Sequence, residues 1–401
     1  MKTKIGTGWS NQTNSREAGI EAATIAIKNG GIARPDFALV FCSGKHNPYE
    51  FLEGVNSILK ETPKIGGSAI GIITDEFIGY DGFEVGVTVF SSDKIIFKTF
   101  AQSDINKNEF IAGSELGMQI QNVITEVSKG LLVFYDSSKQ QNPPMLNFAT
   151  PLFEGIEQYI PEYISIAGGG FLADMQLNTC YQFYNNTVLT QHAVAVLISG
   201  ECTMQTTIMH GCKPCSAYLT ITKTHGSIIY EIDNKPALEV IDELLGNSQK
   251  IKWKDFALYV TLGVNHGDKF GLFDEKEYAN RLTLAVDEEN KALIMFEPDL
   301  KVGDEVQLMR RSIDLNYIET TVSELKATMQ ERIPIFSFYI NCAGRAKPYS
   351  GTDFEDAEEV QRVIGSNIPL MGFYSGVEVA KVGTKLQALD WTGVLCIIGE
   401  E

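Results

Sequence analysis

Several features that mark common classes of protein are missing from this sequence. Basic residues are outnumbered, 33 against 51 acidic ones, and lysines and arginines form no sizeable cluster. Nucleic acids and anionic membranes require a concentrated basic face, so we expect neither as a partner. No stretch approaches the roughly 18 apolar residues of a membrane helix, and the first ten residues lack the apolar core of a signal peptide. We therefore expect a soluble, cytoplasmic protein.

Cysteines are few and irregularly spaced, seven in 401 residues, which argues against a disulfide framework. Cys212 and Cys215 form a Cys-x-x-Cys pair, the spacing seen in zinc and redox sites. The sequence offers no second pair of ligands, and a hairpin rather than a helix follows. We predict no metal and no cofactor, and the pair is either an ordinary loop or a ligand contact.

Phosphate-binding glycine motifs are also missing. Two glycine clusters occur at residues 66–67 and 168–170, but neither forms Gly-x-Gly-x-x-Gly ahead of a helix. We interpret them as points where a neighbouring unit or a small ligand approaches the backbone closely. The resulting candidate ligand contacts are Gly67, Ser68, Gly168 and Gly169.

What the chain does contain is one layout repeated three times. Each copy has a β-branched or aromatic run, a polar loop, an amphipathic helix and an apolar entry into glycine, with the runs at residues 37–42, 131–135 and 335–340. The step from the last apolar helix residue to the glycine is eight in every copy, from Leu59, Ile160 and Ile364. Such regularity indicates a duplicated unit.

The repeat predicts an α/β fold of mixed sheets built from β-α-β-β units, with helices on the outer faces. Repeated units that pack about a pseudo-axis bring loops at equivalent strand ends to a shared cleft. A chain of 401 residues exceeds one ordinary core. We predict two intimately packed domains, residues 1–219 with two units and residues 220–401 with a hairpin, a helix and the closing unit.

Local signals predict where several helices begin. Residues 15–28 and 116–128 have helical periodicity, and a helix at 236–245 ends at Gly246. Within the units we expect helix starts at Asn47-Pro48, at Thr150-Pro151, and at Thr352 with Glu355 as a capping box.

The closing unit holds the densest polar set, at residues 341–345 and 373–378. The guanidinium of Arg345 is suited to bind a carboxylate through two parallel hydrogen bonds, and the carboxylate of Glu378 is suited to bind an ammonium group. Together they would hold a small zwitterion. The alternative is that Arg345 and Glu378 pair with each other.

At these residues the sequence resembles the FIST family, a two-part sensory module of signalling proteins. The resemblance rests on residues 211–214, 220–223, 231–237, 280–281, 303–306, 338–345 and 372–378, which span nearly the whole chain. It implies binding of small ligands, with amino acids as the proposed class, and transmission of occupancy to a signalling protein partner. The matching segments add further candidate ligand contacts: Cys212, Arg281, Cys342, Arg345, Tyr374, Ser375 and Glu378.

The hypothesis we favour is a stand-alone ligand sensor without catalytic residues. A second hypothesis is a hydrolase or transferase that uses Cys342 as nucleophile, but no histidine lies near it in sequence to generate a thiolate. A third is a scaffold whose acidic surface docks another protein.

Overall fold

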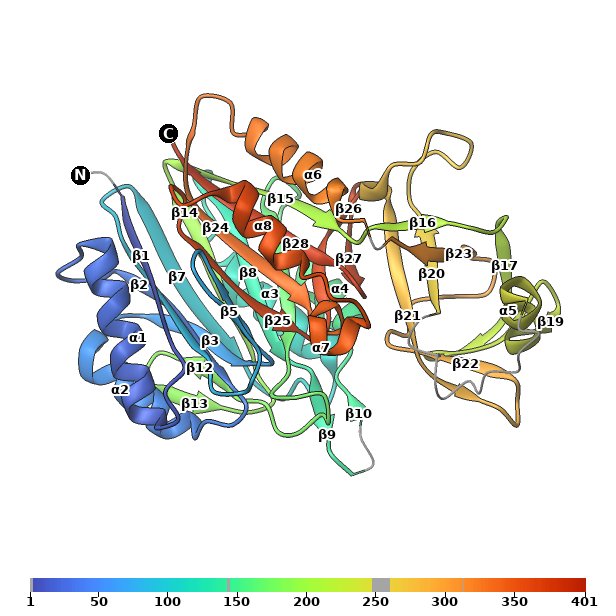
Figure 1. Ribbon diagram of the computed structural model, residues 1–401, viewed down its shortest axis with the longest axis horizontal. Coiled ribbons are helices and arrows are strands. Elements are labelled where there is room, and N and C mark those ends of the chain that lie inside the picture. The colour runs from blue at the N-terminus through green and yellow to red at the C-terminus, as the bar shows by residue number, and fades with distance from the viewer. Residues whose placement is uncertain (1–2, 143–144, 247–259, 313) are drawn as a thin grey trace.

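The computed structural model describes residues 3–142, 145–246, 260–312 and 314–401. The three predicted repeats each form the main part of a six-stranded mixed sheet, and an eight-stranded sheet lies beside them (Figure 1). A small two-stranded sheet consists of β9 (Ser138–Gln140) and β10 (Met145–Leu146). The predicted α/β fold of mixed sheets in two closely packed domains is confirmed.

Every repeat places its strands in the same order. Each sheet begins with the first strand of the unit, which pairs antiparallel with the last strand of the unit. That last strand pairs antiparallel with the strand before the unit's inner helix, and the strand after this helix pairs parallel with the one before it. In the first unit these are β1 (Lys4–Ser10), β6 (Val85–Ser91), β2 (Phe37–Ser43) and β3 (Lys64–Ala69). In the second they are β7 (Ile95–Gln102), β14 (Ala193–Gly200), β8 (Ser128–Asp136) and β11 (Ser165–Phe171). In the third they are β15 (Cys202–Met209), β28 (Gly393–Glu400), β24 (Ile333–Cys342) and β25 (Leu370–Ser375).

The units exchange strands in a cycle. After its second inner strand, each unit sends a short pair of strands to the free edge of another unit's sheet. The first unit's β4 (Ile72–Thr74) and β5 (Ile78–Gly79) extend the third sheet. The second unit's β12 (Gln182–Tyr184) and β13 (Thr187–Leu189) extend the first sheet. The third unit's β26 (Glu378–Val382) and β27 (Lys385–Leu389) extend the second sheet.

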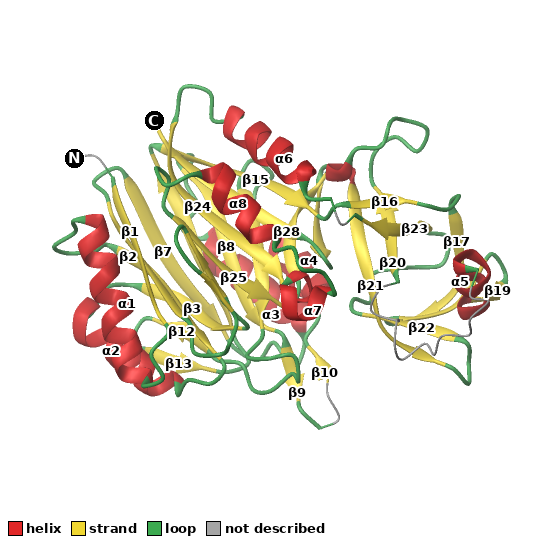
Figure 2. Ribbon diagram, viewed as in Figure 1, coloured by secondary structure: helices red, strands yellow, loops and turns green. Residues whose placement is uncertain are grey.

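Helices lie on the outer faces of these sheets, as predicted (Figure 2). The first sheet is covered by α1 (Ser15–Gly30) and α2 (Pro48–Leu59), and the second by α3 (Glu109–Gln121) and α4 (Ala149–Glu157). The third carries α6 (Asn316–Ala327) and α8 (Asp356–Ile364), with the short α7 (Lys347–Ser350) before α8. The apolar stripe of each helix faces inward, because burying it removes apolar surface from water.

The inner faces of all three sheets share one apolar core. Each sheet contributes one phenylalanine to the centre of this core: Phe41, Phe134 and Phe338. The Phe41 ring centroid lies 6.0 Å from that of Phe134 and 5.8 Å from that of Phe338, and the Phe134 and Phe338 centroids are 5.6 Å apart. One glycine in each unit lies against a carbonyl of the paired strand. These glycines are Gly66, Gly168 and Gly372. A Cβ added to each would lie 1.7, 2.2 and 2.3 Å, respectively, from the carbonyl oxygen of the facing residue. These glycines are therefore required by sheet packing.

Between β15 and α6 the chain forms a separate eight-stranded sheet, here called the β domain. Its strands are β16 (Cys212–Pro214), β17 (Leu219–His225), β18 (Ile228–Ile232), β19 (Lys235–Pro236), β20 (Thr261–Asn265), β21 (Tyr278–Asp287), β22 (Ala292–Met295) and β23 (Glu305–Arg311). Pairing of β20 with β23 closes the sheet on itself, and α5 (Ala237–Leu245) packs on its core. The division at residues 219 and 220 stays a prediction, and strand pairing crosses it at β15–β28 and β16–β23.

Three helix starts differ from their predictions. The helix expected at 116–128 begins at Glu109, where the Asn108 side chain accepts the amide N–H of Ile111, and ends at Gln121. The helix expected to start at Thr150-Pro151 begins at Ala149 without a side-chain cap of its own. The expected capping box at Thr352 and Glu355 is absent, because Glu355 accepts the Tyr374 hydroxyl instead.

Candidate functional site

Arg345 is buried and its guanidinium is fully used by the protein. Its Nε and Nη2 donate to Asp356 Oδ2 at 2.9 and 2.7 Å, and Nη2 also donates to the Tyr317 hydroxyl. Its Nη1 donates to the carbonyls of His210 and Trp391. All five N–H groups therefore have partners. The alternative pairing with Glu378 is wrong, because α8 brings Asp356 to the guanidinium.

Glu378 lies instead in a different buried group, which we call the junction cluster: Tyr135, Ser137, Asn280, Glu297, Glu378 and Asp390. Tyr135 is the second-last residue of β8, and Ser137 directly follows that strand. Glu378 opens β26 and Asp390 follows β27, so both come from the closing unit. Asn280 on β21 and Glu297 after β22 come from the β domain. The cluster thus lies where the second unit, the third unit and the β domain meet.

Backbone and side-chain donors orient the three carboxyl groups of the junction cluster. Glu378 accepts the Ser375 hydroxyl at 2.6 Å and the Thr392 amide at 3.3 Å. Glu297 accepts the amide N–H groups of Ala149 and Thr150 at 3.0 and 2.9 Å, so the β domain caps α4. Asp390 accepts the Leu282 amide at 2.9 Å.

Burial raises the pKa of each of these carboxyl groups, because a charge is poorly solvated in the protein interior. The pKa of Glu297 rises to about 8 and that of Asp390 to about 7, while the pKa of Glu378 rises well above its usual value. The charge of Asp390 contributes to raising the other two. At neutral pH the cluster therefore resists holding three negative charges at once.

Several polar atoms of the junction cluster have no hydrogen-bond partner among the described residues. They are Tyr135 Oη, Ser137 Oγ, Asp390 Oδ1 and both amide atoms of Asn280. The Tyr135 and Ser137 hydroxyls lie near each other, and the Asn280 amide lies near the Cys212 thiol, but neither pair has the geometry of a standard hydrogen bond. All four residues are at most 2% exposed. Buried polar groups in native proteins nearly always have partners, so this set is unusual. Gly170 packs directly against this set, since a Cβ there would lie 1.8 Å from Ser137 Oγ and 3.0 Å from Tyr135 Oη.

The remaining predicted contacts divide between this cluster and other places. Ser375 bonds Glu378, and a Cβ on Gly169 would lie 3.4 Å from the Ser375 Cβ, so both adjoin the cluster. Gly67 and Ser68 lie elsewhere, against β12: Ser68 exchanges hydrogen bonds with the backbone of Tyr181. Gly168 lies against the Val133 carbonyl.

Two other predicted contacts serve packing between elements. Arg281 forms an ion pair with Asp299 inside the β domain and donates to the Ala388 carbonyl of β27 at 2.6 Å, so it joins the β domain to the closing unit. Tyr374 donates to Glu355 at 2.6 Å.

The two predicted thiol contacts are buried. The Cys212 amide donates to His210 Nδ1 at 2.9 Å, and burial raises the pKa of the Cys212 thiol to about 11. Burial, followed by the nearby Glu378, also raises the pKa of the Cys342 thiol. Thiols of this kind form little thiolate at neutral pH.

Sequence reasoning missed five members of the junction cluster, Tyr135, Ser137, Asn280, Glu297 and Asp390, as well as the Arg345 partner Asp356. Asn280 adjoins a segment that carried the family resemblance, and Tyr135 closes a predicted strand, so each had a weak positional signal. Nothing local distinguishes Glu297, Asp356 or Asp390 from the other acidic residues.

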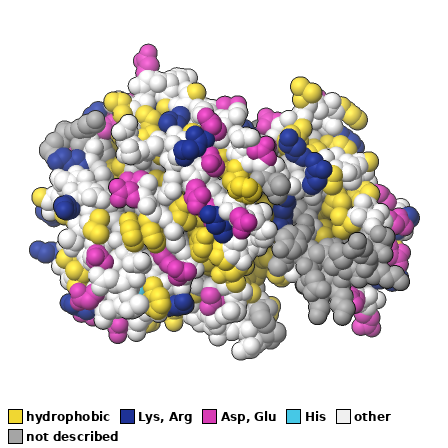
Figure 3. Space-filling view, in the orientation of Figure 1, with side chains coloured by type: hydrophobic (Ala, Val, Ile, Leu, Met, Phe, Trp, Pro, Cys, Tyr) yellow, Lys and Arg dark blue, Asp and Glu magenta, His cyan; other side chains and the backbone are white. Residues whose placement is uncertain are grey.

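In the parts of the chain that the structure describes, no three His, Cys, Asp or Glu side chains are grouped as metal ligands. None of the helices in those parts is long and apolar enough to pass through a membrane. Acidic and basic side chains are interspersed over the face shown in Figure 3.

Comparisons with known proteins identify two matching family models. The FIST N domain matches residues 36–235 and the FIST C domain matches residues 237–381. The uncharacterized protein MJ1623 of Methanocaldococcus jannaschii is 22% identical over 275 residues, covering 65% of this chain and 51% of that protein. The uncharacterized protein Rv0628c of Mycobacterium tuberculosis is 23% identical over 223 residues, covering 54% of this chain and 55% of that protein. The chain thus spans about half the length of these curated relatives.

Two solved structures of cyanuric acid hydrolases are similar at a low level. One aligns over the whole of both chains with a TM-score of 0.34 and 7% identity. The other, from A. caulinodans, has a TM-score of 0.29 and 10% identity, covering 49% of this chain and 71% of that one. Likeness at this level assigns no activity to this chain.

Proposed function

The chain belongs to the FIST family, whose domains are sensory domains of signal transduction, and we propose that it senses an amino acid or related small amine at the junction cluster. The observation that carries this proposal is the set of buried, unpartnered polar atoms on Tyr135, Ser137, Asn280 and Asp390. They adjoin carboxyl groups whose pKa values burial has raised.

The chemistry of the junction cluster favours a ligand with an ammonium group. Glu378 and Asp390 are costly to ionise without a cation, and a bound ammonium would supply the missing charge. The hydroxyls of Tyr135 and Ser137 and the Asn280 amide are donors that suit the carboxylate of an amino acid. The ligand would thus complete hydrogen bonds that the protein alone leaves unmade.

The position of the cluster supports a means of transmission. Asn280 and Glu297 belong to the β domain, whereas Tyr135, Ser137, Glu378 and Asp390 belong to the part formed by the three repeat units, here called the body. A ligand that contacts both sides stabilises one placement of the β domain against the body. A signalling protein partner that contacts both parts would then respond to occupancy.

A thermal-shift screen of the twenty amino acids and common amines tests this function. A ligand that binds only the folded protein at a hundred times its Kd adds ~2.7 kcal/mol of stability. We expect a hit whose shift disappears in Glu378→Gln and Tyr135→Phe. Glu355→Gln is the matched control, because Glu355 is also a buried glutamate with a raised pKa but lies outside the cluster.

The pH dependence gives a second readout. An ammonium ligand binds the ionised carboxylates, so affinity should rise as pH rises through about 7, where Asp390 ionises. No shift from any compound, or a shift that both cluster variants retain, would contradict the proposal. The alternative of an enzyme with Cys342 as nucleophile is not favoured, since burial raises the pKa of that thiol.

A further inference from the structure

A groove with a volume of about 430 Å³ lies between α2 and the hairpin strand β13, away from the junction cluster. Figure 1 shows β13 at the margin of the first sheet, beside α2. The helix lines the groove with Tyr49, Leu52, Glu53 and Asn56, and the strand lines it with Thr187 and Val188. One wall of the groove is therefore a helix, and the other is the last strand of a sheet.

The outer edge of β13 pairs with no other strand in the described parts of the chain. On its inner side β13 pairs with β12, where Thr187 lies opposite Tyr184 across a two-residue turn and Val188 lies opposite Phe183. The residues beside such a turn form the hydrogen-bonded pair, and the next pair along is not hydrogen-bonded. The backbone N–H and C=O of Val188 therefore point away from β12. A free donor and acceptor on a strand edge offer a template for a further strand.

The equivalent hairpin of the third unit shows how this protein uses such an edge. Its outer strand, β27, is the last strand of the second sheet, as β13 is of the first. The same alternation of pairs directs the Ala388 carbonyl of β27 outward, and Arg281 of the β domain donates to it at 2.6 Å. Among the described residues no donor from another element reaches the backbone of β13. The edge of β13 therefore stays open where its counterpart is engaged.

The side chains of the groove favour an apolar residue with a basic neighbour. Leu52 belongs to the apolar cluster under α2, and Val188 packs against that cluster, so the Val188 side chain lies on the helix side of the sheet. Tyr49 adds a ring that is 61% exposed. Of the described residues that line the groove, only Glu53 is charged, and its ion pair with Arg16 is exposed and hence weak. Asn56 Oδ1 is buried without a hydrogen-bond partner among the described residues.

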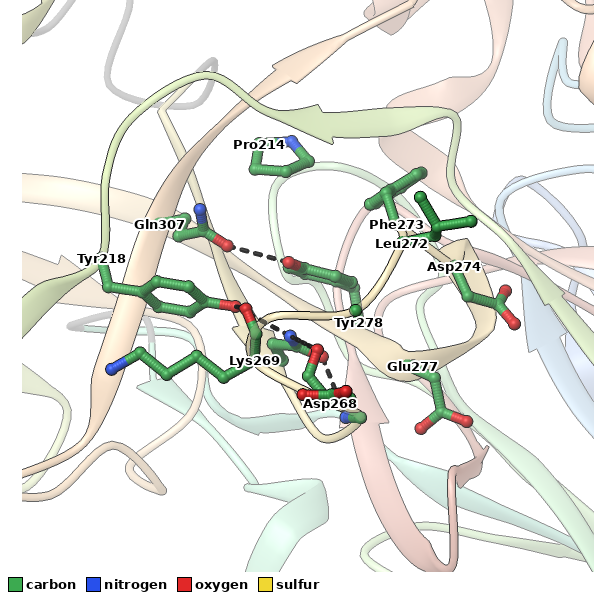
Figure 4. Close-up of a pocket in the computed structure, with 13 residues that line it drawn as sticks. Pro214, Tyr218, Asp268, Lys269, Leu272, Phe273, Asp274, Glu277, Tyr278 and Gln307 are labelled. Atoms are coloured by element: carbon green, nitrogen blue, oxygen red, sulfur yellow. Dashed lines mark hydrogen bonds between the residues drawn. The ribbon is translucent and has the colours of Figure 1, made fainter.

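A pocket in the β domain, with a volume of about 200 Å³, differs because its polar groups are already paired (Figure 4). The Tyr278 hydroxyl donates to Gln307 Oε1, and the Tyr218 hydroxyl accepts from Asn265 Nδ2, both at 2.8 Å. The Lys269 ammonium lies 4.8 Å from the centre of the Tyr218 ring. These groups are satisfied within the protein, whereas the outward backbone of β13 is not.

We propose that β13 and α2 bind an extended segment of a partner protein as an added strand, with an apolar residue opposite Val188 and a basic residue beside Glu53. Strand addition obtains affinity from backbone hydrogen bonds and specificity from alternate side chains, which here would contact α2. A second copy of this chain fits less well, because both copies carry a net charge of -18 and would bring two Glu53 side chains together. The proposal does not rest on the function of the junction cluster, since the two places share no residue.

Fluorescence anisotropy of labelled peptides titrated with the full chain tests the site. The probes are capped peptides Lys-Thr-x-Thr-Lys in which x is valine, isoleucine, leucine, phenylalanine or tyrosine. With x opposite Val188, the residue x and both lysines lie on the α2 side. The matched probe is the tightest of these peptides with its three central residues N-methylated, which keeps the side chains but removes the backbone donors. We expect it to bind about tenfold more weakly.

Substitutions in the protein test each wall of the groove. Val188→Pro removes an N–H that points away from β12, so the chain should fold and bind the peptide about tenfold more weakly. Tyr49→Ala should also weaken binding, and it serves should Val188→Pro fail to fold, because the Tyr49 side chain is exposed. Glu53→Gln should reduce the dependence of affinity on salt. Tyr163→Ala is the matched control: it removes a tyrosine that is 57% exposed elsewhere and should leave binding unchanged.

Four outcomes would overturn the proposal. They are no binding of any of the five peptides at millimolar concentration, equal binding of the N-methylated probe, native affinity in both Val188→Pro and Tyr49→Ala, and self-association of the native chain that Val188→Pro abolishes. The last result would assign the edge to a second copy of this chain. A negative ligand screen at the junction cluster would leave these peptide measurements unaffected, so the two proposals fail separately.

Discussion

Replacement of Arg345 tests whether this residue holds the fold or a ligand. The side chains of Arg345 and Asp356 are 5% and 4% exposed, so the ion pair is buried. Arg345→Ala leaves the Asp356 carboxylate with two donors among the described residues, the Tyr339 hydroxyl at 2.8 Å and the Asn341 amide at 3.0 Å. It also removes a donor from the carbonyls of His210 and Trp391. Breaking a buried pair in this way costs ~3–5 kcal/mol.

The assay is the free energy of unfolding in urea for Arg345→Ala, Asp356→Ala and the double variant. We expect each single variant to lose ~3–5 kcal/mol and the double variant to lose less than their sum, with a coupling of ~1–3 kcal/mol. Arg362→Ala is the control: its ion pairs are exposed, so its effect should stay within ~1 kcal/mol.

The pH dependence of this loss has a definite sign. Arg345 lowers the pKa of Asp356 in the folded protein, against the opposing effect of burial. The pair therefore contributes its full stability above the unfolded pKa of ~3.9 and loses it as pH falls further. The difference between the native chain and Arg345→Ala should accordingly shrink in acid. The reasoning is refuted if Arg345→Lys folds with native stability yet loses ligand affinity, because the guanidinium would then act on ligand rather than on Asp356.

Three further predictions concern stability and reactivity. Asp390→Asn should remove a loss of stability that the native chain shows as pH rises from 3.8 to about 7; the rise of this pKa corresponds to ~4 kcal/mol over that whole interval, and urea unfolding at about pH 4 and about pH 7.5 measures it. Titration of the native protein with a thiol reagent should find one fast site, Cys215, the exposed cysteine; the prediction is wrong if Cys215→Ser keeps the fast phase or if Cys342 is labelled first. Gly168→Ala should destabilise the second sheet by ~1–3 kcal/mol, because its Cβ would meet the Val133 carbonyl at 2.2 Å, and native stability in that variant would contradict the packing explanation.

Features that depend on nearby residues could be predicted well. The helix expected at 15–28 is observed as Ser15–Gly30, and the one after Asn47 begins at Pro48 with Asn47 as its cap. Gly246 ends α5 in the left-handed conformation, as its position indicated. Apolar spacing and caps are local signals, so the sequence carries them without knowledge of the fold.

Features set by distant residues were predicted poorly. The start of α4 looked like a Thr-Pro signal, yet its free N–H groups are satisfied by Glu297, which lies 148 residues away from Ala149 in the chain. Arg345 is paired with Asp356 rather than Glu378 for the same kind of reason. Many carboxylates suit a given donor chemically, and only the packed fold decides which one comes within reach.

The sequence by itself determined that three similar units exist, where most of their strands and helices lie, and which faces are apolar, because periodicity records burial. The sequence did not determine that each unit would add a pair of strands to the sheet of another unit. Every free strand edge offers the same backbone donors and acceptors, so local sequence does not select which edge is used. That exchange carries Glu378 onto β26 beside the second unit, and contact with the β domain adds Glu297 and Asn280. The candidate site is therefore a product of tertiary structure, because its members are brought together by strand pairing and packing across the whole chain.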